Sequence, residues 1–229
     1  MVKQVVVRPS GPMQKATADN AVTGGAVVRT GAESRAELTF ADQAIARLGA
    51  NSALQVGDAG LTLDSGALLL DAPAASTTGL VRTGAINIDG RGATAIIERY
   101  GSTYAKILIL QGTARVFLPA TVGESMLLKS GQMVIMKPNA VTLAEPVDYD
   151  IGQLYRTSVL IGREFDRLTS QPQIANEIAK QRENAKLVPT NLVINGRGTL
   201  VTLASSAKPK GGGTAKPAAS PTPASTPRR

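Results

Sequence analysis

Residues 28–52 read VRTGAESRAELTFADQAIARLGANS, and apolar and polar residues alternate through much of this stretch. Side chains of an extended chain point alternately to opposite faces, which separates two sets here: Ala36, Leu38 and Phe40 from Arg35, Glu37 and Thr39. Alternation of this kind predicts strands with one buried and one exposed face. This part of the chain is therefore predicted to form β-sheet.

The same kind of pattern extends from residue 25 to residue 146. Short apolar runs are separated by Gly, Asp, Asn or Pro at a spacing of roughly 8–12 residues, which is typical of an all-β fold. Leu61–Leu63 and Leu68–Leu70 are predicted as two separate strands of this series, and Val141–Ala144 as its last. No helical patterns separate the strands, which argues against an α/β fold. We predict a Gly-punctuated β domain, solenoid-like or sandwich-like, over 25–146, with a leading strand and loop over 1–24.

One short sequence occurs twice in this region. VRTGA appears at residues 28–32 and again at 81–85, and both copies lead into a further apolar run. A repeat within a series of strands favours equivalent corners of a winding β-structure over coincidence. We expect the two copies to occupy similar positions in the fold.

Beyond residue 146 the apolar residues take up helical spacing. Residues 150–161 show it weakly, and residues 170–186 predict the better helix, with Ser170 as a cap and Pro172 in the first turn. Ile174 and Ile178 lie one turn apart and form a narrow apolar stripe. The helix is therefore expected to rest lightly on the protein or to meet a partner.

The chain is predicted to end in a hairpin and a tail. Asn195-Gly196 is a strong turn signal between residues 191–194 and 199–203. We group 147–204 as a helical extension with this hairpin, and 205–229 as a disordered, basic, Pro/Ala-rich tail. Five of the eight net positive charges lie in that tail, so the rest of the chain is only mildly basic: Lys208, Lys210, Lys216, Arg228 and Arg229.

The composition removes several classes of chemistry. The 229 residues contain no Cys and no His, so thiol nucleophiles, disulfides and imidazole bases or ligands are excluded. No run of the sequence is long and apolar enough for a membrane span, and residues 1–10 contain too short an apolar run for a signal peptide. The chain is therefore expected to be either cytoplasmic or a mature form with a replacement Met1. We predict no cofactor and no metal, and not an enzyme.

The stretch at residues 28–52 resembles the start of the FecR domain. In that family a TG-x-x-S-R-A-E-L strand leads through a Phe-x-Asp turn to an R-L-G-x-N-S/T strand, and residues 30–38, 40–42 and 47–52 match these three motifs. Looser similarities follow at 61–73, 105–116 and 131–133. The resemblance covers about residues 25–145.

The resemblance implies a β domain outside the cytoplasmic membrane. Founding members of the family relay a signal from an outer-membrane transporter to a sigma factor. This chain shows neither their sigma-binding region nor their membrane span, so it is more similar to stand-alone envelope proteins that carry the domain. The resemblance thus implies a periplasmic or cell-surface location, which the residues themselves do not encode.

The motif residues allow a recognition role or a structural one. The charged members are candidates for a recognition face, whereas opposite charges on neighbouring strands commonly pair across the outer face of a sheet. Glycines at turns, and Asp42 and Asn51 bonded to nearby backbone, favour the structural role. The motif residues are Arg29, Thr30, Gly31, Ser34, Arg35, Glu37, Asp42, Arg47, Gly49 and Asn51.

Other candidate sites are weaker. Two acidic pairs, Asp148/Asp150 and Glu164/Asp166, could in principle act as acid/base groups. The chain has no His or Cys with which they could act in catalysis, so we interpret them as solvated charge. Tyr100 and Tyr104 flank a short turn, where such a pair more often decorates a hairpin than binds a sugar or peptide.

Three functions follow from this reading. The first is a non-enzymatic envelope protein that binds or scaffolds another protein or a cell-surface polymer, with a role in envelope signalling. The second is a structural subunit of a surface assembly that self-associates through strand edges and the 170–186 helix. The third is a polyanion binder that uses the five cations of the tail, without sequence-specific binding of nucleic acid.

Overall fold

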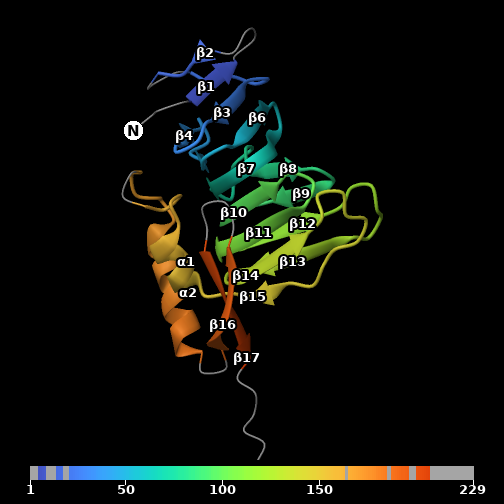
Figure 1. Ribbon diagram of the computed structural model, residues 1–229, viewed down its shortest axis with the longest axis vertical. Coiled ribbons are helices and arrows are strands. Elements are labelled where there is room, and N and C mark those ends of the chain that lie inside the picture. Colours follow the sequence, from blue (N-terminus) through green and yellow to red (C-terminus); the bar gives the residue numbers. More distant parts are fainter. Residues whose placement is uncertain are drawn as a thin grey trace, which may run out of the picture.

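The computed structural model describes residues 5–8, 14–17, 21–162, 165–184, 187–195 and 200–206. Strands are by far the commonest element among these residues, which confirms the predicted all-β class (Figure 1). Fifteen strands form one curled sheet, and a separate two-stranded hairpin accompanies two helices within the described ranges. The strands of the curled sheet are β1 (Val5–Arg8), β2 (Gln14–Lys15), β3 (Val27–Thr30), β4 (Ala36–Thr39), β5 (Ile45–Leu48), β6 (Ala53–Gly57), β7 (Gly60–Ala72), β8 (Leu80–Thr83), β9 (Ile86–Asp89), β10 (Ala93–Tyr100), β11 (Tyr104–Gln111), β12 (Thr113–Phe117), β13 (Ser125–Lys129), β14 (Gln132–Met136) and β15 (Val147–Asp148).

The curled sheet folds back on itself into two layers that share β7. We call the strands β2-β1-β3-β6-β7-β8-β9-β12-β13 the outer layer, and β4-β5-β7-β10-β11-β14-β15 the middle layer. The first half of β7 pairs with β6 and β8, and its second half pairs with β5 and β10. The arrangement is therefore sandwich-like, which is one of the two predicted forms.

The passage of β7 between layers depends on Gly66. This residue has φ +88°, and a Cβ there would overlap the side chain of Ser52. The Ser52 hydroxyl also bonds to the backbone of Ala67. Because glycine turns the chain without ending its pairing, the predicted strands Leu61–Leu63 and Leu68–Leu70 are one strand, and that part of the prediction was wrong.

The other predicted strand runs agree with the structure with four exceptions. Val141–Ala144 is not in a strand. Three strands were missed: β6, the two-residue β2, which lies inside the predicted loop, and the two-residue β15, which lies beyond the last predicted run. The polar and glycine residues of β6 hide its short alternation, and a two-residue strand has no detectable period.

A large apolar core lies between the two layers. It includes Val28, Leu54 and Leu63 from the outer layer and Leu48 and Ile97 from the middle layer, all of them buried. Alternate residues along each strand supply this core, as the sequence pattern predicts.

The C-terminal extension covers the far face of the middle layer. It consists of α1 (Ile151–Thr157), α2 (Gln171–Glu183) and the hairpin β16 (Leu187–Asn195) with β17 (Leu200–Ser206). Tyr149, Leu154, Ile174 and Val201 pack there against apolar side chains of the middle layer, including Leu69. The molecule therefore has three layers, with the helices on one side and the outer layer on the other (Figure 1).

The predicted helix and hairpin are confirmed in type and place. α2 begins after Ser170 with Pro172 in its first turn, and Ile174 is fully buried. β16 pairs with β17 in antiparallel fashion, although the predicted turn at Gly196 lies outside the described residues. Ser205 and Ser206 belong to β17 rather than to the predicted tail, whose remaining residues also lie outside that range. Neither α1 nor α2 has the length and apolarity needed to cross a membrane.

Candidate functional site

The motif residues of the FecR-like stretch lie in three separate clusters. The first is a corner at which the Thr30 hydroxyl donates to the Gly49 carbonyl at 2.6 Å and accepts from the Ser52 amide at 2.9 Å. The Asn51 amide donates to the Gly31 carbonyl at 3.0 Å, and Asn51 itself has φ +54°. Gly49 packs against Ala67 of β7. These contacts join the ends of β3, β5 and β6 to the point where β7 changes layer.

The two VRTGA copies share a structural role at their threonines. Thr30 and Thr83 are both buried at the end of a strand, and both follow an exposed arginine. The Thr83 hydroxyl donates to the Leu63 carbonyl at 3.0 Å, as the Thr30 hydroxyl does to the Gly49 carbonyl. The prediction that the copies occupy similar positions therefore agrees with the structure.

The second cluster is centred on Asp42. Its carboxylate accepts hydrogen bonds from the amides of Ala44 and Thr78 and from the Ser76 hydroxyl. Burial by itself would raise the pKa of Asp42, but these hydrogen bonds outweigh it and hold the pKa well below its usual range. Asp42 thus ties the β4–β5 turn to the loop before β8.

The third cluster is centred on Arg47, which is only 1% exposed. Its guanidinium bonds to Glu37 at 2.6 Å and to the carbonyls of Leu160 and Asp166 at 3.1 and 2.5 Å, and it lies 4.7 Å from the centre of the Phe165 ring. The expected Arg–Glu pair across β4 and β5 is therefore present, but not on a solvated face. The segment after α1 covers it.

The remaining motif residues are split between surface and interior. Arg29 is exposed on the outer layer, and the Ser34 hydroxyl is buried against the Ala32 carbonyl. Arg35 is half-buried near the same turn. The motif residues therefore do not converge on one pocket.

The weaker candidates are distributed through the fold. Tyr100 and Tyr104 stack across the β10–β11 hairpin with ring centres 5.5 Å apart. This arrangement agrees with the prediction that the pair lies at a hairpin turn. Asp150 is not simply solvated charge, because it caps α1 by accepting from the Gln153 amide at 2.8 Å. Glu164 and the five cations of the tail lie outside the described residues.

Three further charged residues are buried without any local sequence signal for their burial: Glu98, Lys106 and Asp71. Glu98 and Lys106 face each other on β10 and β11 with an ion pair of 2.7 Å, and both are almost fully buried. Asp71 is buried beside the start of α2, where it accepts from the Ser170 amide and the Thr94 hydroxyl. A cavity of about 340 Å³ adjoins Asp71. Within its lining Asp71 is bonded to Ser170, at the start of α2, so we interpret the cavity as part of the support of that helix.

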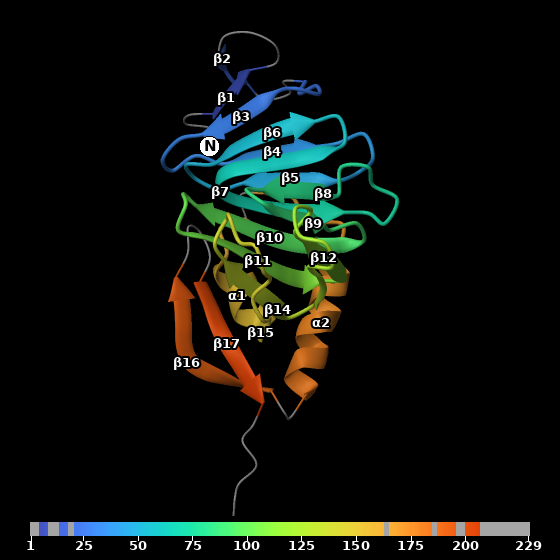
Figure 2. The same cartoon turned by 90° about the vertical axis from the view of Figure 1, so that its right-hand side faces the viewer.

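The outer face of the outer layer is a better candidate for binding. None of the described elements packs over it, whereas the opposite side of the molecule carries both helices (Figure 2). The outward side chains of β3, β8 and β12 include Arg29, Arg82 and Arg115, all exposed. Within the described part of the chain, neither Arg29 nor Arg82 has a hydrogen bond or ion pair.

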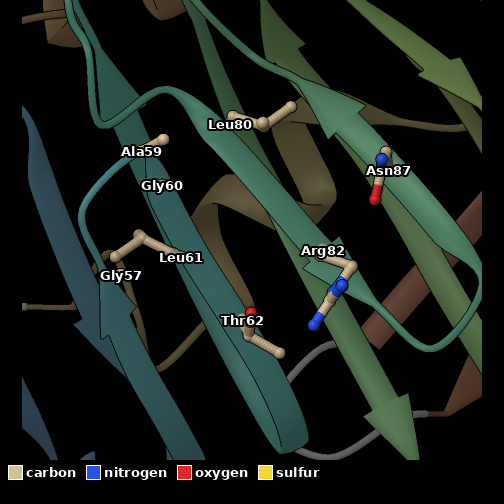
Figure 3. A pocket seen from close by; sticks show the side chains of 8 residues that line it. All are labelled: Gly57, Ala59, Gly60, Leu61, Thr62, Leu80, Arg82 and Asn87. Carbon is tan, nitrogen blue, oxygen red and sulfur yellow. The ribbon is translucent and has the colours of Figure 1, made fainter. Parts of the chain in front are cut away.

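A shallow groove of about 260 Å³ crosses this face, between the β6–β7 hairpin and the strands β8 and β9 (Figure 3). Its lining is Gly57, Ala59, Gly60, Leu61, Thr62, Leu80, Arg82 and Asn87. Gly60 has φ +141°, and a Cβ there would overlap the Leu80 carbonyl. Glycine therefore lets the hairpin approach β8 closely and leaves the surface low on that side.

The polar groups of the groove are aligned by strand register. Thr62 on β7 lies opposite Arg82 on β8, and Arg82 lies opposite Asn87 on β9. The side-chain oxygen of Asn87 is buried and has no donor among the described residues. The groove thus combines a free cation, a side-chain amide and an aliphatic wall, which can bind a ligand but offers no activated nucleophile.

No local sequence signal marks this groove. Only the repeated VRTGA and the alternation of β8 indicate that Arg82 is an outward residue. The pairing of β7 with β8 is parallel and spans two residue pairs, so it depends on the path of the whole chain.

Residues 26–115 match the model of the family described as FecR protein, which confirms the resemblance of this part of the chain. The match runs from β3 into β12 and so includes the motif clusters and the groove. No curated protein sequence matches the chain.

Two crystal structures of a protein described provisionally as an anti-sigma factor, from Parabacteroides distasonis, are similar to this chain. The 1.65 Å structure has a TM-score of 0.48 and 12% identity, and the similarity covers 79% of this chain and 99% of that one. The 2.50 Å structure has a TM-score of 0.48 and 10% identity, with 77% and 97% covered.

Proposed function

We propose, from the FecR-family match of residues 26–115, that the chain is a non-enzymatic envelope protein that binds another protein or a cell-surface polymer in envelope signalling. The observation that carries the proposal is the outer face that no described element covers, on which Arg29 and Arg82 have no partner among the described residues. A sheet face that is left uncovered and carries unpaired cations is a natural docking surface, because arginine binds carboxylates and phosphates with well-defined geometry.

The composition supports a binding role over catalysis. The chain has no His and no Cys. The polar clusters around Asp42, Arg47 and Asp71 are bonded within the fold and hold elements together. The groove residues can bind a ligand through charge, hydrogen bonds and apolar contact, but they include no activated nucleophile. We therefore propose that the middle layer and the extension support the outer layer, and that the outer layer makes the contact.

The binding proposal is tested by site-specific photocrosslinking in the native host. A photoreactive residue at Gln55, which is exposed on β6 beside the groove, is expected to give an adduct with one recurrent partner. The matched control is Lys180, 68% exposed on α2 on the opposite side, where no adduct with that partner is expected. Equal adducts at both positions, or none at Gln55, would contradict the proposal.

The location outside the cytoplasmic membrane is proposed from the family alone. Cell fractionation of the protein expressed from its native locus, with mass spectrometry of the mature N-terminus, checks it. A cytosolic protein with an untrimmed N-terminus would argue against it and would favour the polyanion-binding alternative.

A second candidate function is a structural subunit of a surface assembly. It is favoured by β13, which pairs only with β12 in the described part of the chain and exposes 63% of Leu127. Exposed edge strands can pair with another copy. The apolar stripe of α2 is not available for this purpose, because Ile174 packs on the middle layer. Concentration-dependent size on a sizing column, abolished by Leu127→Lys, would support self-association.

A further inference from the structure

We infer that the groove on the outer layer binds an extended acidic segment of a partner protein, with a carboxylate at Arg82. The inference rests on the proposed function and makes it more specific, because it names the chemistry of the partner segment and the residues that bind it.

The outer face carries more positive than negative charge. Among the outer-layer strands from β3 to β13, the outward positions hold more cations than acids, and one of the acids, Asp89, is half-buried and paired with Arg91. The cations are Arg29, Arg82, Arg115 and Lys129, and the acids are Asp64 and Asp89. An acidic partner is therefore attracted to this face more strongly than a basic or neutral one.

The shape and lining of the groove suit an extended chain. At about 260 Å³ it is smaller than most sites for free small molecules, which span roughly 300–1,000 Å³. It is open rather than enclosed, and Gly57, Ala59 and Gly60 leave one side with no side chain larger than a methyl group. Such a groove has room for one or two residues of a chain that continues across the sheet (Figure 3).

The groups of the groove suit a peptide with an acidic side chain. The Arg82 guanidinium has no partner of its own in the described structure, so a carboxylate can take a bidentate, charge-assisted bond there. Asn87 adds a side-chain amide to the lining, and the NH2 group of an asparagine can donate to a peptide carbonyl. Leu80 supplies an aliphatic wall for the neighbouring side chain.

A protein segment fits this lining better than an anionic polysaccharide. No aromatic ring lines the groove, although sugar rings are commonly bound by stacking on aromatic faces. The alternating polar and apolar residues of an extended peptide match a wall that is cationic on one side and aliphatic on the other.

The test uses the full chain and fluorescence anisotropy with three labelled probes. They are a 12-residue peptide alternating Glu and Val, the same peptide with Gln in place of Glu, and a polygalacturonate fragment of similar charge. The Glu/Val peptide is expected to bind, more weakly as salt is raised, and the Gln/Val peptide at least tenfold more weakly. Tighter binding of polygalacturonate than of the Glu/Val peptide would overturn the inference in favour of a polymer ligand.

Three variants locate the binding. Arg82→Gln is expected to weaken the Glu/Val peptide about tenfold, the usual loss for one charge-assisted hydrogen bond. Thr62→Tyr fills the groove without changing charge and is expected to weaken it similarly. Arg167→Gln makes the same charge change on the exposed segment before α2 and is expected to change affinity less than twofold.

Two outcomes separate this inference from the proposed function. If Arg82→Gln and Arg167→Gln weaken the peptide equally, or if the Glu/Val peptide does not bind, the acidic-segment inference fails. A recurrent adduct at Gln55 would then still support the binding proposal. Circular dichroism and melting of each variant exclude loss of folding as the cause.

Discussion

The charged residues of the middle layer show how a strand pattern can mislead at the level of single residues. Arg47, Glu98 and Lys106 are charged residues of strands β5, β10 and β11, yet all three are buried. The C-terminal extension covers the face of the middle layer on which they lie, so these charges must be paired. Arg47 does this with one carboxylate and two carbonyls.

Replacing Arg47 tests this arrangement. Arg47→Met is expected to lower the free energy of unfolding by about 3 kcal/mol, because it leaves Glu37 and the carbonyls of Leu160 and Asp166 without their donor. Chemical denaturation measures the change. The exposed Arg29→Met on the outer layer is the matched control, with an expected change within about 0.5 kcal/mol. Equal effects of the two substitutions would show that Arg47 is not held as described.

Asp42 gives the protein a pH-dependent contribution to stability. Its pKa is lowered in the folded state, so its contribution is fully present above the unfolded-state value of about 3.9 and is lost as the pH falls below it. The unfolding free energy of the native chain should exceed that of Asp42→Asn at pH 6, by about 1 kcal/mol given the partial exposure of Asp42. The difference should shrink toward pH 3. Asp64→Asn, at an exposed position of β7, is the control, and a constant difference for Asp42→Asn would contradict the assignment.

At the scale of elements, the junction between β7 and α2 joins the β domain to the extension. Ser170 stands at the start of α2, but its side chain makes no capping bond. The carboxylate of Asp71, on β7, accepts from the Ser170 amide instead. A negative charge at a helix N-terminus is favourable, so a residue 99 positions away acts as the cap.

Removing this carboxylate should loosen α2 before it affects the sheet. Asp71→Ala is expected to cost about 1–2 kcal/mol, the range of a lost helix cap. Hydrogen exchange should rise in the first turn of α2, at Gln173 and Ile174, more than in β10. Asp64→Ala, exposed on the same strand, should leave exchange in α2 unchanged. Unaltered protection of α2 in Asp71→Ala would show that another contact anchors the helix.

At the scale of the whole molecule, the two outer faces of the sandwich differ in whether other elements cover them. The extension covers the middle layer, burying Leu69, Ile96 and Leu108 completely. No described element covers the outer layer. This asymmetry is the basis for placing the binding face on the outer layer.

A truncation tests whether the β domain needs its extension. A chain ending at residue 146 exposes the apolar face of the middle layer, so it is expected to bind a hydrophobic dye and to lose its sharp thermal transition. The control ends at Ser206 and keeps every described element. If the shorter chain melts as cooperatively as the control, residues 25–146 are an independent domain. The predicted boundary at 146 would then gain its first support.

Most strands, the helix after Ser170 and the C-terminal hairpin are predictable because each depends on neighbouring residues. Alternation along β4, the helical spacing of Ile174 and Ile178, and Asn195-Gly196 are local signals. The motif of residues 30–52 also indicated the family. Local signals failed where a strand continued through a glycine, at Gly66, and where alternation was short, at β6.

The sequence by itself determined the all-β class, the FecR resemblance and the absence of His and Cys chemistry, because these follow from composition and short-range pattern. Only the tertiary structure decided which polar positions are buried, which face stays open, and that Arg82, Asn87 and Gly60 meet in one groove. The reason is physical: burial and contact depend on what packs across a layer. For Arg47 and for Asp71 the deciding partners lie about a hundred residues away along the chain.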